Sequence, residues 1–187
     1  MATVFVAALL QSLAAAKPPN VILFLADDLG FNGLGCYGSD LHETPNIDAL
    51  AADGVKFTDA YSACTVWSPS RAAIMTGKYP ARLHLTDFIA GQNQPFAKLA
   101  IPEWTKGMRH EEVTLAEALH QGGYKTAHVG KWHLNFKGDQ AKQFEPVDHG
   151  FDLQVMMPPA KGYFMTRPAG GFHQGDFTTD YFASEAA

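Results

Sequence analysis

The 187-residue sequence predicts an α/β fold in which a mostly parallel sheet is flanked by helices. Three observations predict it: a buried-strand pattern early in the chain, helices with clear start and stop signals, and alternation between the two. Apolar residues make up 47% of the chain and charged residues 18%, as in globular proteins. The length is enough for one domain with a sizeable core.

The first predicted elements are a strand, a helix and a second strand. Residues 21–26 form a short apolar run with a β-branched start, which indicates a strand buried on both faces. The following helix has Thr44 as its N-cap, proline at its first position, and Gly54 as its stop. Residues 55–60 alternate between apolar and polar, as a half-buried strand does.

The next elements repeat this order. Ser68 is predicted to cap a second helix, with proline at its first position and Gly77 at its end. Residues 114–117 form a capping box, so a third helix begins there and ends at a Gly-Gly pair. Residues 125–130 are the strand that follows. Strands alternating with capped helices indicate βαβ units and therefore a parallel sheet.

The rest of the chain carries weaker signals. Residues 92–108 are rich in Pro, Gln and Asn, residues 136–175 contain several Gly and Pro, and both are predicted as loops. A helix begins near Thr178 and breaks off after about two turns, which favours a truncated chain over a natural terminus.

Residues 1–16 are predicted to be a secretory signal peptide, because an apolar stretch precedes three small residues. Residues 17–187 would then be the mature part of a secreted or periplasmic protein. An ordinary apolar helix is the alternative, because the stretch begins without Lys or Arg. It is too short to span a membrane, and no other segment is long enough.

Charge and cysteine content exclude several classes of protein. The net charge of −5 and the absence of a basic patch argue against nucleic acid as a partner. Cys36 and Cys64 form neither a disulfide framework nor a zinc-site spacing. Two buried free thiols and a single pair both remain open.

Two adjacent carboxylates, Asp27 and Asp28, follow the first predicted strand. Functional sites in parallel α/β folds lie at the carboxyl ends of strands, and carboxylate oxygens suit a hard cation. On this pattern alone a turn or a helix cap is the alternative, since aspartate favours both.

An ordered series of motifs resembles the formylglycine-dependent sulfatases of the alkaline phosphatase superfamily. The matching segments are residues 20–30, 35–39, 44–48, 62–78, 130–134 and 149–152. The resemblance runs from residue 20 to about residue 182, and it implies an alkaline-phosphatase-like fold truncated at its C-terminus. It also implies hydrolysis of sulfate monoesters on sugars or aryl alcohols, so the expected partner is a sulfated small molecule or glycan.

The resemblance assigns roles to five residues. Asp27 and Asp28 would be calcium ligands, and Arg71 would hold the hydrated aldehyde and offset its charge. Lys131 would grip the sulfate, and His133 would hydrogen-bond the hydrate and help eliminate sulfate. Lys131 and His133 alternate on an extended backbone, so both are expected to project from one face. Without the resemblance, a solvated strand end and an ordinary polar contact are the alternatives for these two.

Position 67 departs from the family pattern. In the family a Cys, or sometimes a Ser, followed by x-Pro-x-Arg is oxidised to the formylglycine nucleophile. Here Trp67 stands at that position, and indole offers only an N–H donor and apolar bulk. Cys64 and Ser68 have the wrong spacing to replace it. The family's remaining metal ligands lie beyond residue 187, so the Ca²⁺ site would be incomplete, and the chain is predicted to be inactive.

Three alternatives to an active sulfatase stay open. A non-catalytic pseudoenzyme would bind sulfated glycans through Arg71, Lys131 and His133, with Trp67 stacking on a sugar ring. A related phosphate-ester hydrolase would need Ser or Thr at position 67, so the tryptophan argues against it. The last is a gene fragment with no function of its own.

Overall fold

The computed structural model describes residues 17–92, 94–136, 143–158, 160–161, 163–168 and 170–187. The predicted signal peptide, residues 1–16, lies outside them and stays a prediction. The chain divides into two compact units, one ending at Lys56 and one beginning at Phe57.

The described part of the first unit, from residue 17 on, contains one α-helix and two short 3-10 helices. They are η1 (Phe31–Gly33), η2 (Gly35–Tyr37) and α2 (Pro45–Asp53). α2 confirms the predicted N-cap at Thr44 and stop at Gly54. The Thr44 hydroxyl donates to Asp48 Oδ1 over 3.0 Å, and the same oxygen accepts from the Cys36 backbone N–H at 2.7 Å. The Asp48 carboxylate therefore links the first turn of α2 to η2.

Two predicted strands are absent from the described part of the chain. Residues 21–26 and 55–60 belong to neither of the two sheets that the described residues form. Their large side chains are accessible to solvent: Phe24 is 83% exposed and Phe57 is 69% exposed. An apolar run becomes a strand only when a neighbouring strand takes up its backbone hydrogen bonds. No described strand does so here, and both predictions were wrong.

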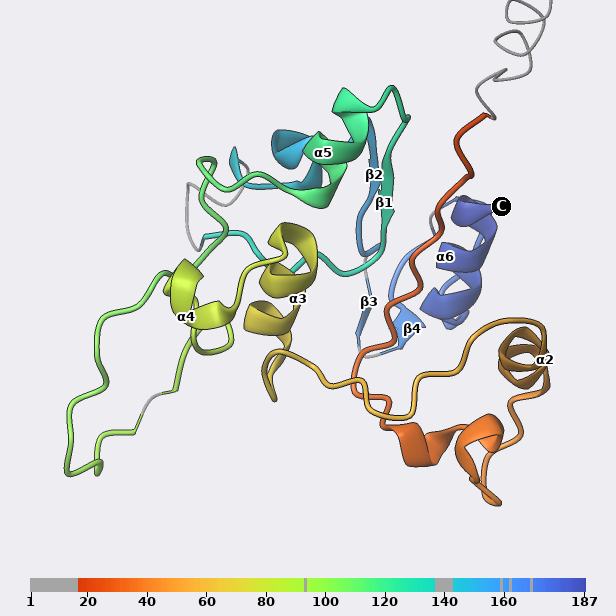
Figure 1. The fold of residues 1–187 in the computed structure, drawn as a ribbon, viewed down its shortest axis with the longest axis horizontal. Helices are drawn as coiled ribbons and strands as arrows, with labels where there is room; N and C mark the ends of the chain where they lie inside the picture. Colours follow the sequence, from red (N-terminus) through yellow and green to blue (C-terminus); the bar gives the residue numbers. More distant parts are fainter. Residues whose placement is uncertain (1–16, 93, 137–142, 159, 162, 169) are drawn as a thin grey trace, which may run out of the picture. The chain divides into compact units, whose positions relative to one another are not determined.

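The second unit combines helices with two short sheets (Figure 1). Its elements among the described residues are α3 (Trp67–Thr76), α4 (Pro80–Leu83), α5 (Leu115–Gln121), β1 (Ala127–Val129), η4 (Pro146–His149), β2 (Leu153–Val155), β3 (Ala160–Lys161), β4 (Phe164–Met165) and α6 (Thr178–Ala186). β1 and β2 are parallel, whereas β3 and β4 are antiparallel. The helices and the parallel pair confirm the predicted α/β class.

Of the two strands in the parallel pair, only the first was predicted from the sequence. β1 confirms the strand expected within residues 125–130, but β2 lies in a region predicted as a loop. Ala127 pairs with Leu153, and the ladder continues where the Gly130 N–H donates to the Val155 carbonyl at 2.8 Å. Three residues are too few for a periodicity to be visible in the sequence. The second strand was missed for this reason.

The start of α3 differs from the prediction by one residue. Val66 is the N-cap and Trp67 is the first helical residue, whereas Ser68 was predicted as the cap. The buried Ser68 hydroxyl instead accepts the Ile89 backbone N–H at 3.0 Å. The predicted stop at Gly77 is confirmed, and its φ of 66° is a conformation that favours glycine.

α5 confirms the predicted capping box. The Thr114 hydroxyl accepts the Glu117 backbone N–H, and the Glu117 carboxylate accepts the Thr114 backbone N–H. The Thr114 hydroxyl also donates to the His149 carbonyl at 2.7 Å. This side chain therefore caps α5 and joins it to η4. α6 begins at Thr178 as predicted, although Phe177 is its N-cap.

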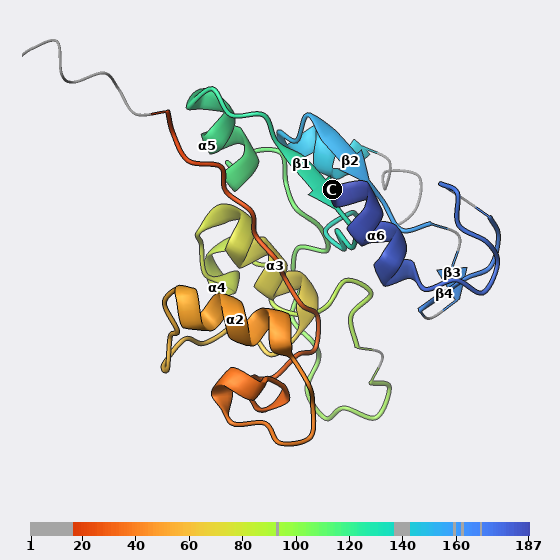
Figure 2. The ribbon, with the colours of Figure 1, turned by 90° about the vertical axis from the view of Figure 1, so that its right-hand side faces the viewer.

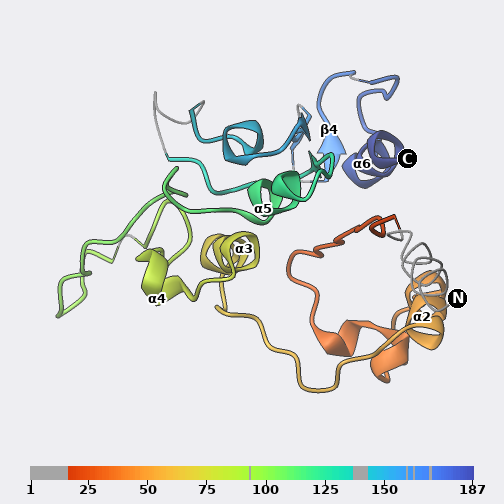
Figure 3. The ribbon, with the colours of Figure 1, turned by 45° about the horizontal axis from the view of Figure 1, so that its top comes forward.

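The core of the second unit lies between α3 and the segment after β1. Its buried members are Ala72, Met75, Leu83, Leu85, Met108, Trp132 and Leu134. α3 also packs beside α5 (Figure 3), and α6 lies beside β1 (Figure 2). The described part of residues 92–108 has no helix or strand, which confirms the loop predicted there. Figure 1 shows it as a long loop.

Two smaller observations concern the cysteines and the membrane. Cys36 and Cys64 are both free thiols, and each is half-buried. In the parts of the chain that the structure describes, every helix is too short or too polar to cross a bilayer.

Candidate active site

The side chain at position 67 is surrounded by aromatic and cationic groups. Trp67 begins α3, and its ring meets the Phe88 ring edge-on with centroids 5.7 Å apart. The His133 ring lies 6.0 Å from the indole, tilted by 38°. The Lys131 ammonium lies 4.7 Å from the centroid of the indole, which is cation–π distance. The structure therefore brings Lys131 and His133 together around Trp67.

Arg71 joins the same group from one helical turn further along α3. Residues four apart on a helix share a face, which puts Arg71 on the side of Trp67. Its side chain is only 7% exposed, and Nη1 donates a hydrogen bond to the Lys131 carbonyl. A buried guanidinium is stable only when hydrogen bonds or an anion compensate its lost hydration. Arg71 thus ties α3 to the segment after β1 and adds a second cation.

The segment that carries Lys131 and His133 is not the extended strand end that was predicted. β1 ends at Val129, and the chain then turns through Gly130 with φ 104° and His133 with φ 58°. Both values lie in the left-handed region, so simple alternation of side chains does not apply. The two side chains reach Trp67 through this bend, while Trp132 between them points into the core.

His133 is also in contact with the loop after α4. Its Nε2 lies 3.3 Å from the Ile89 carbonyl oxygen, and the Ile89 N–H is bound by Ser68 on α3. Sequence reasoning missed Phe88, Ile89 and this use of Ser68. No motif marks them, because their positions depend on how the loop folds back onto α3.

Asp27 and Asp28 lie in the first unit, whereas the other four predicted site residues lie in the second. Both aspartates are exposed and form a turn, with Asp28 at φ 60°. Among the described residues there is no group of three or more His, Cys, Asp or Glu side chains that could hold a metal ion. Calcium takes six to eight oxygen ligands, so the two carboxylates do not fit a complete site by themselves.

The electrostatics of the second unit also involve a buried histidine on β1. Burial, reinforced by the nearby charge of Arg71, lowers the pKa of His128 from 6.5 to about 4. His128 is therefore neutral at physiological pH. The positive charge in this region comes from Arg71 and Lys131, which makes the site suited to an anion.

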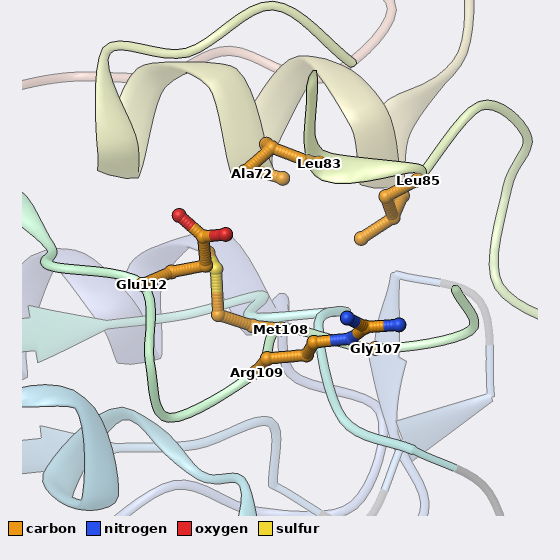
Figure 4. Close-up of a pocket in the computed structure, with 7 residues that line it drawn as sticks. All are labelled: Ala72, Leu83, Leu85, Gly107, Met108, Arg109 and Glu112. Atoms are coloured by element: carbon orange, nitrogen blue, oxygen red, sulfur yellow. The ribbon is translucent and has the colours of Figure 1, made fainter. Parts of the chain in front are cut away.

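A separate small pocket lies on the core side of α3 (Figure 4). It is lined by Ala72, Leu83, Leu85, Gly107, Met108, Arg109 and Glu112. The Glu112 carboxylate is already paired with the Lys78 ammonium. None of the predicted site residues lines this pocket, and its walls are mainly core side chains.

A helix that begins at the candidate site, two cations beside it and a parallel strand pair in the same unit define an α/β arrangement suited to binding an anion. The family model for sulfatases matches residues 19–182. The chain belongs to the sulfatase family. Its relatives include arylsulfatases and steryl-sulfatases, which are sulfuric ester hydrolases.

Human arylsulfatase A is 43% identical over 151 residues, covering 81% of this chain and 27% of the relative. Rat steryl-sulfatase is 41% identical over 167 residues, covering 87% of this chain and 28% of the relative. The chain thus spans about a quarter of the length of these relatives.

Solved structures give the same result for the fold. A protein solved in complex with its substrate D-glucosamine-2-N,6-O-disulfate has a TM-score of 0.67 at 29% identity, covering 91% of this chain and 30% of that protein. The structure of Ps i-CgsB has a TM-score of 0.63 at 35% identity, covering 79% of this chain and 30% of that one. The alkaline-phosphatase-like sulfatase fold predicted from the motifs is confirmed.

Proposed function

We propose that this chain is the N-terminal portion of a catalytic domain that hydrolyses sulfate monoesters, and that it is inactive as it stands. The proposed substrates are sulfated carbohydrates or aryl sulfates. One observation carries the proposal: the indole of Trp67, the residue that the motif resemblance aligns with the nucleophile, contacts Lys131 and His133. The cations suit a sulfate group, whereas the indole cannot attack it.

The proposed roles follow from the chemistry of the side chains. Arg71 and Lys131 would compensate the negative charge of the sulfate, and His133 would transfer a proton. Covalent catalysis needs an activated nucleophile, and Trp67 has only an N–H donor. Its ring also fills space beside Lys131 that a sulfate oxygen would need.

The metal and the cellular location belong to the same proposal. Asp27 and Asp28 would contribute part of a calcium shell, and the remaining oxygens would have to come from other groups. The ion would supply positive charge beside the sulfate when bound. A leader at residues 1–16 would direct the chain to secretion or to the periplasm.

The first test is turnover of a chromogenic aryl sulfate in the presence of calcium. We expect no rate above that of a Trp67→Ala variant, because neither side chain at position 67 can form the covalent intermediate. An active arylsulfatase in the same assay checks the conditions, and mass spectrometry of the chain should give an unmodified tryptophan at position 67. Turnover above the variant, or a formyl-bearing residue at position 67, would contradict the proposed inactivity.

A second candidate function is non-catalytic binding of sulfated glycans. It is favoured by the half-buried Trp67 ring with the Lys131 ammonium on its face, because sugars stack on aromatic rings while sulfate pairs with cations.

Calorimetry with sulfated and desulfated oligosaccharides tests this candidate. We expect heat only from the sulfated ligand, and a loss of about tenfold in affinity, or about 1.4 kcal/mol, in a Lys131→Ala variant. A Lys125→Ala variant is the matched control, because Lys125 is exposed and pairs with Asp152 instead. Equal binding of both ligands, or equal effects of both variants, would contradict sulfate recognition at this site.

A further inference from the structure

We propose that Ser68 and the loop of residues 87–91 fix which ring nitrogen of His133 carries the proton. In this arrangement Nε2 is protonated in the neutral ring, and Nδ1 is the nitrogen that accepts a proton. Ser68 is then a positioning residue for His133. The inference rests on the proposed function for its catalytic meaning, although the tautomer itself can be measured without any turnover.

The first step is the contact between His133 and the loop. Nε2 lies 3.3 Å from the Ile89 carbonyl oxygen. A carbonyl oxygen only accepts hydrogen bonds, so Nε2 must donate in order to bond to it. A neutral imidazole carries one proton, and its Nδ1 then holds the lone pair. The Ile89 carbonyl therefore selects one of the two tautomers.

The second step is the anchoring of Ile89 itself. The Ser68 hydroxyl accepts the Ile89 N–H at 3.0 Å, and both residues are buried. A backbone N–H left without a partner in the interior is costly, so this bond strongly favours one orientation of the Ile89 backbone. The N–H of Ile89 is thereby held by α3, while its carbonyl lies at His133.

The backbone conformation of the loop also supports a fixed position for the Ile89 carbonyl. The Gly91 N–H donates to the Phe88 carbonyl at 2.7 Å, which closes a tight turn around Ile89. Ala90 has φ 134°, a conformation that residues with a Cβ rarely adopt. Such a conformation persists only when the surrounding contacts hold it in place, and functional sites are where it tends to occur. The Ile89 carbonyl is therefore a fixed acceptor and not a freely moving one.

The consequence concerns proton transfer at position 67. His133 lies 6.0 Å from the Trp67 ring, centroid to centroid, so it is beside the position where the family pattern has its nucleophile. A histidine acts as a base through the nitrogen that has a lone pair. Fixing the proton on Nε2 leaves Nδ1 for that task, and the Ser68–Ile89 link supports this choice through the Ile89 carbonyl at Nε2.

The test is a long-range ¹H–¹⁵N correlation spectrum of the histidine side chains of the full chain at about pH 8, above the ordinary histidine pKa of about 6.5. The chain has 8 histidines, and a His133→Gln variant identifies the signals of His133. We expect the wild-type chain to give the pattern of a single tautomer protonated on Nε2. A Ser68→Ala variant should give a mixture, with the ¹⁵N shifts of the two nitrogens moving toward each other.

A matched control is available on the same helix. The Ser70 hydroxyl donates to the Cys64 and Val66 carbonyls and pairs with the Ser62 hydroxyl, so its partners precede the first helical residue of α3. Ser70→Ala removes the same atom and should leave the His133 signals unchanged, whereas Ser68→Thr keeps the hydroxyl and should preserve the single tautomer.

Three outcomes would overturn the proposal. They are a wild-type His133 protonated on Nδ1, a folded Ser68→Ala variant with an unchanged tautomer, and an equal response to Ser70→Ala. If Ser68→Ala does not fold, the wild-type tautomer and Ser68→Thr still decide. Lack of sulfatase turnover or of glycan binding would count against the proposed function alone, because the tautomer does not depend on either.

Discussion

Replacing Trp132 by alanine is expected to destabilise the second unit by about 3–5 kcal/mol, the range for truncating a buried aromatic side chain. Trp132 is 1% exposed, and its Nε1–H donates to the Phe144 carbonyl at 2.8 Å. Its ring packs against His128 and His149, with centroids 5.3 and 5.6 Å away. The change therefore leaves a cavity and a carbonyl without its donor.

Urea unfolding followed by far-ultraviolet circular dichroism measures this loss without depending on tryptophan fluorescence. Trp104→Ala is the control, because Trp104 is half-buried in the loop and its removal should cost only about 1 kcal/mol. Equal losses in the two variants would show that Trp132 does not hold the unit together. We also expect the Trp132→Ala change to loosen the contacts of the neighbouring Lys131 and His133 with Trp67.

Acidification is expected to weaken the fold between about pH 6.5 and pH 4. His128 is buried, and its pKa is lowered from 6.5 to about 4 by burial and, second, by the charge of Arg71. Below pH 6.5 the unfolded chain binds a proton at this position and the folded chain does not. Stability is therefore complete above pH 6.5 and falls as the pH drops toward 4, by at most about 3 kcal/mol from this residue.

A second histidine contributes in the same direction. Burial and the neighbouring His110 lower the pKa of His149, while Glu117 and Asp148 oppose the shift. The His149 ring stacks on His110 with centroids 5.0 Å apart, so a proton on either ring repels a proton on the other. Asp152 responds at lower pH, since hydrogen bonds from Thr126 lower the pKa of its carboxyl from 3.8.

The measurement is the free energy of unfolding at a series of pH values from about 7.5 to 4.5, bracketing the ordinary histidine pKa. His128→Phe should flatten the dependence, because it removes the group whose protonation differs between the folded and unfolded chains. His120→Gln, at an exposed position at the end of α5, should leave the dependence as it is. A stability that rises on acidification, or a slope unchanged by His128→Phe, would contradict the assignment.

Local signals predicted the helices better than the strands, of which only β1 was predicted correctly. The capping box at Thr114 involves residues within one turn of each other, so the sequence contains the whole interaction, and the Thr44–Asp48 hydrogen bond at the start of α2 is equally local. A strand depends on a partner that is remote in the chain. Residues 21–26 and 55–60 have the apolar pattern of strands, but no described strand pairs with them. β2 pairs with β1 although its sequence has no such pattern.

The candidate site was predictable to a similar extent. The motifs selected Arg71, Lys131 and His133; the structure places Lys131 and His133 against Trp67 and bonds Arg71 to the Lys131 carbonyl. Their catalytic roles stay predictions. Ser68 and Ile89 were not selected, because the hydrogen bond between them spans 21 positions and closes only when the loop folds back. The metal prediction also remains open, since Asp27 and Asp28 belong to the other unit.

The accessible apolar run at residues 21–26 has a practical consequence for these experiments. Each large side chain left in water forgoes about 1.5–3 kcal/mol that burial would give. Apolar segments that lie outside a sheet pair readily with a second copy of themselves. Concentrated samples of the chain should therefore self-associate, and the spectra and heats are best collected at the lowest workable concentration.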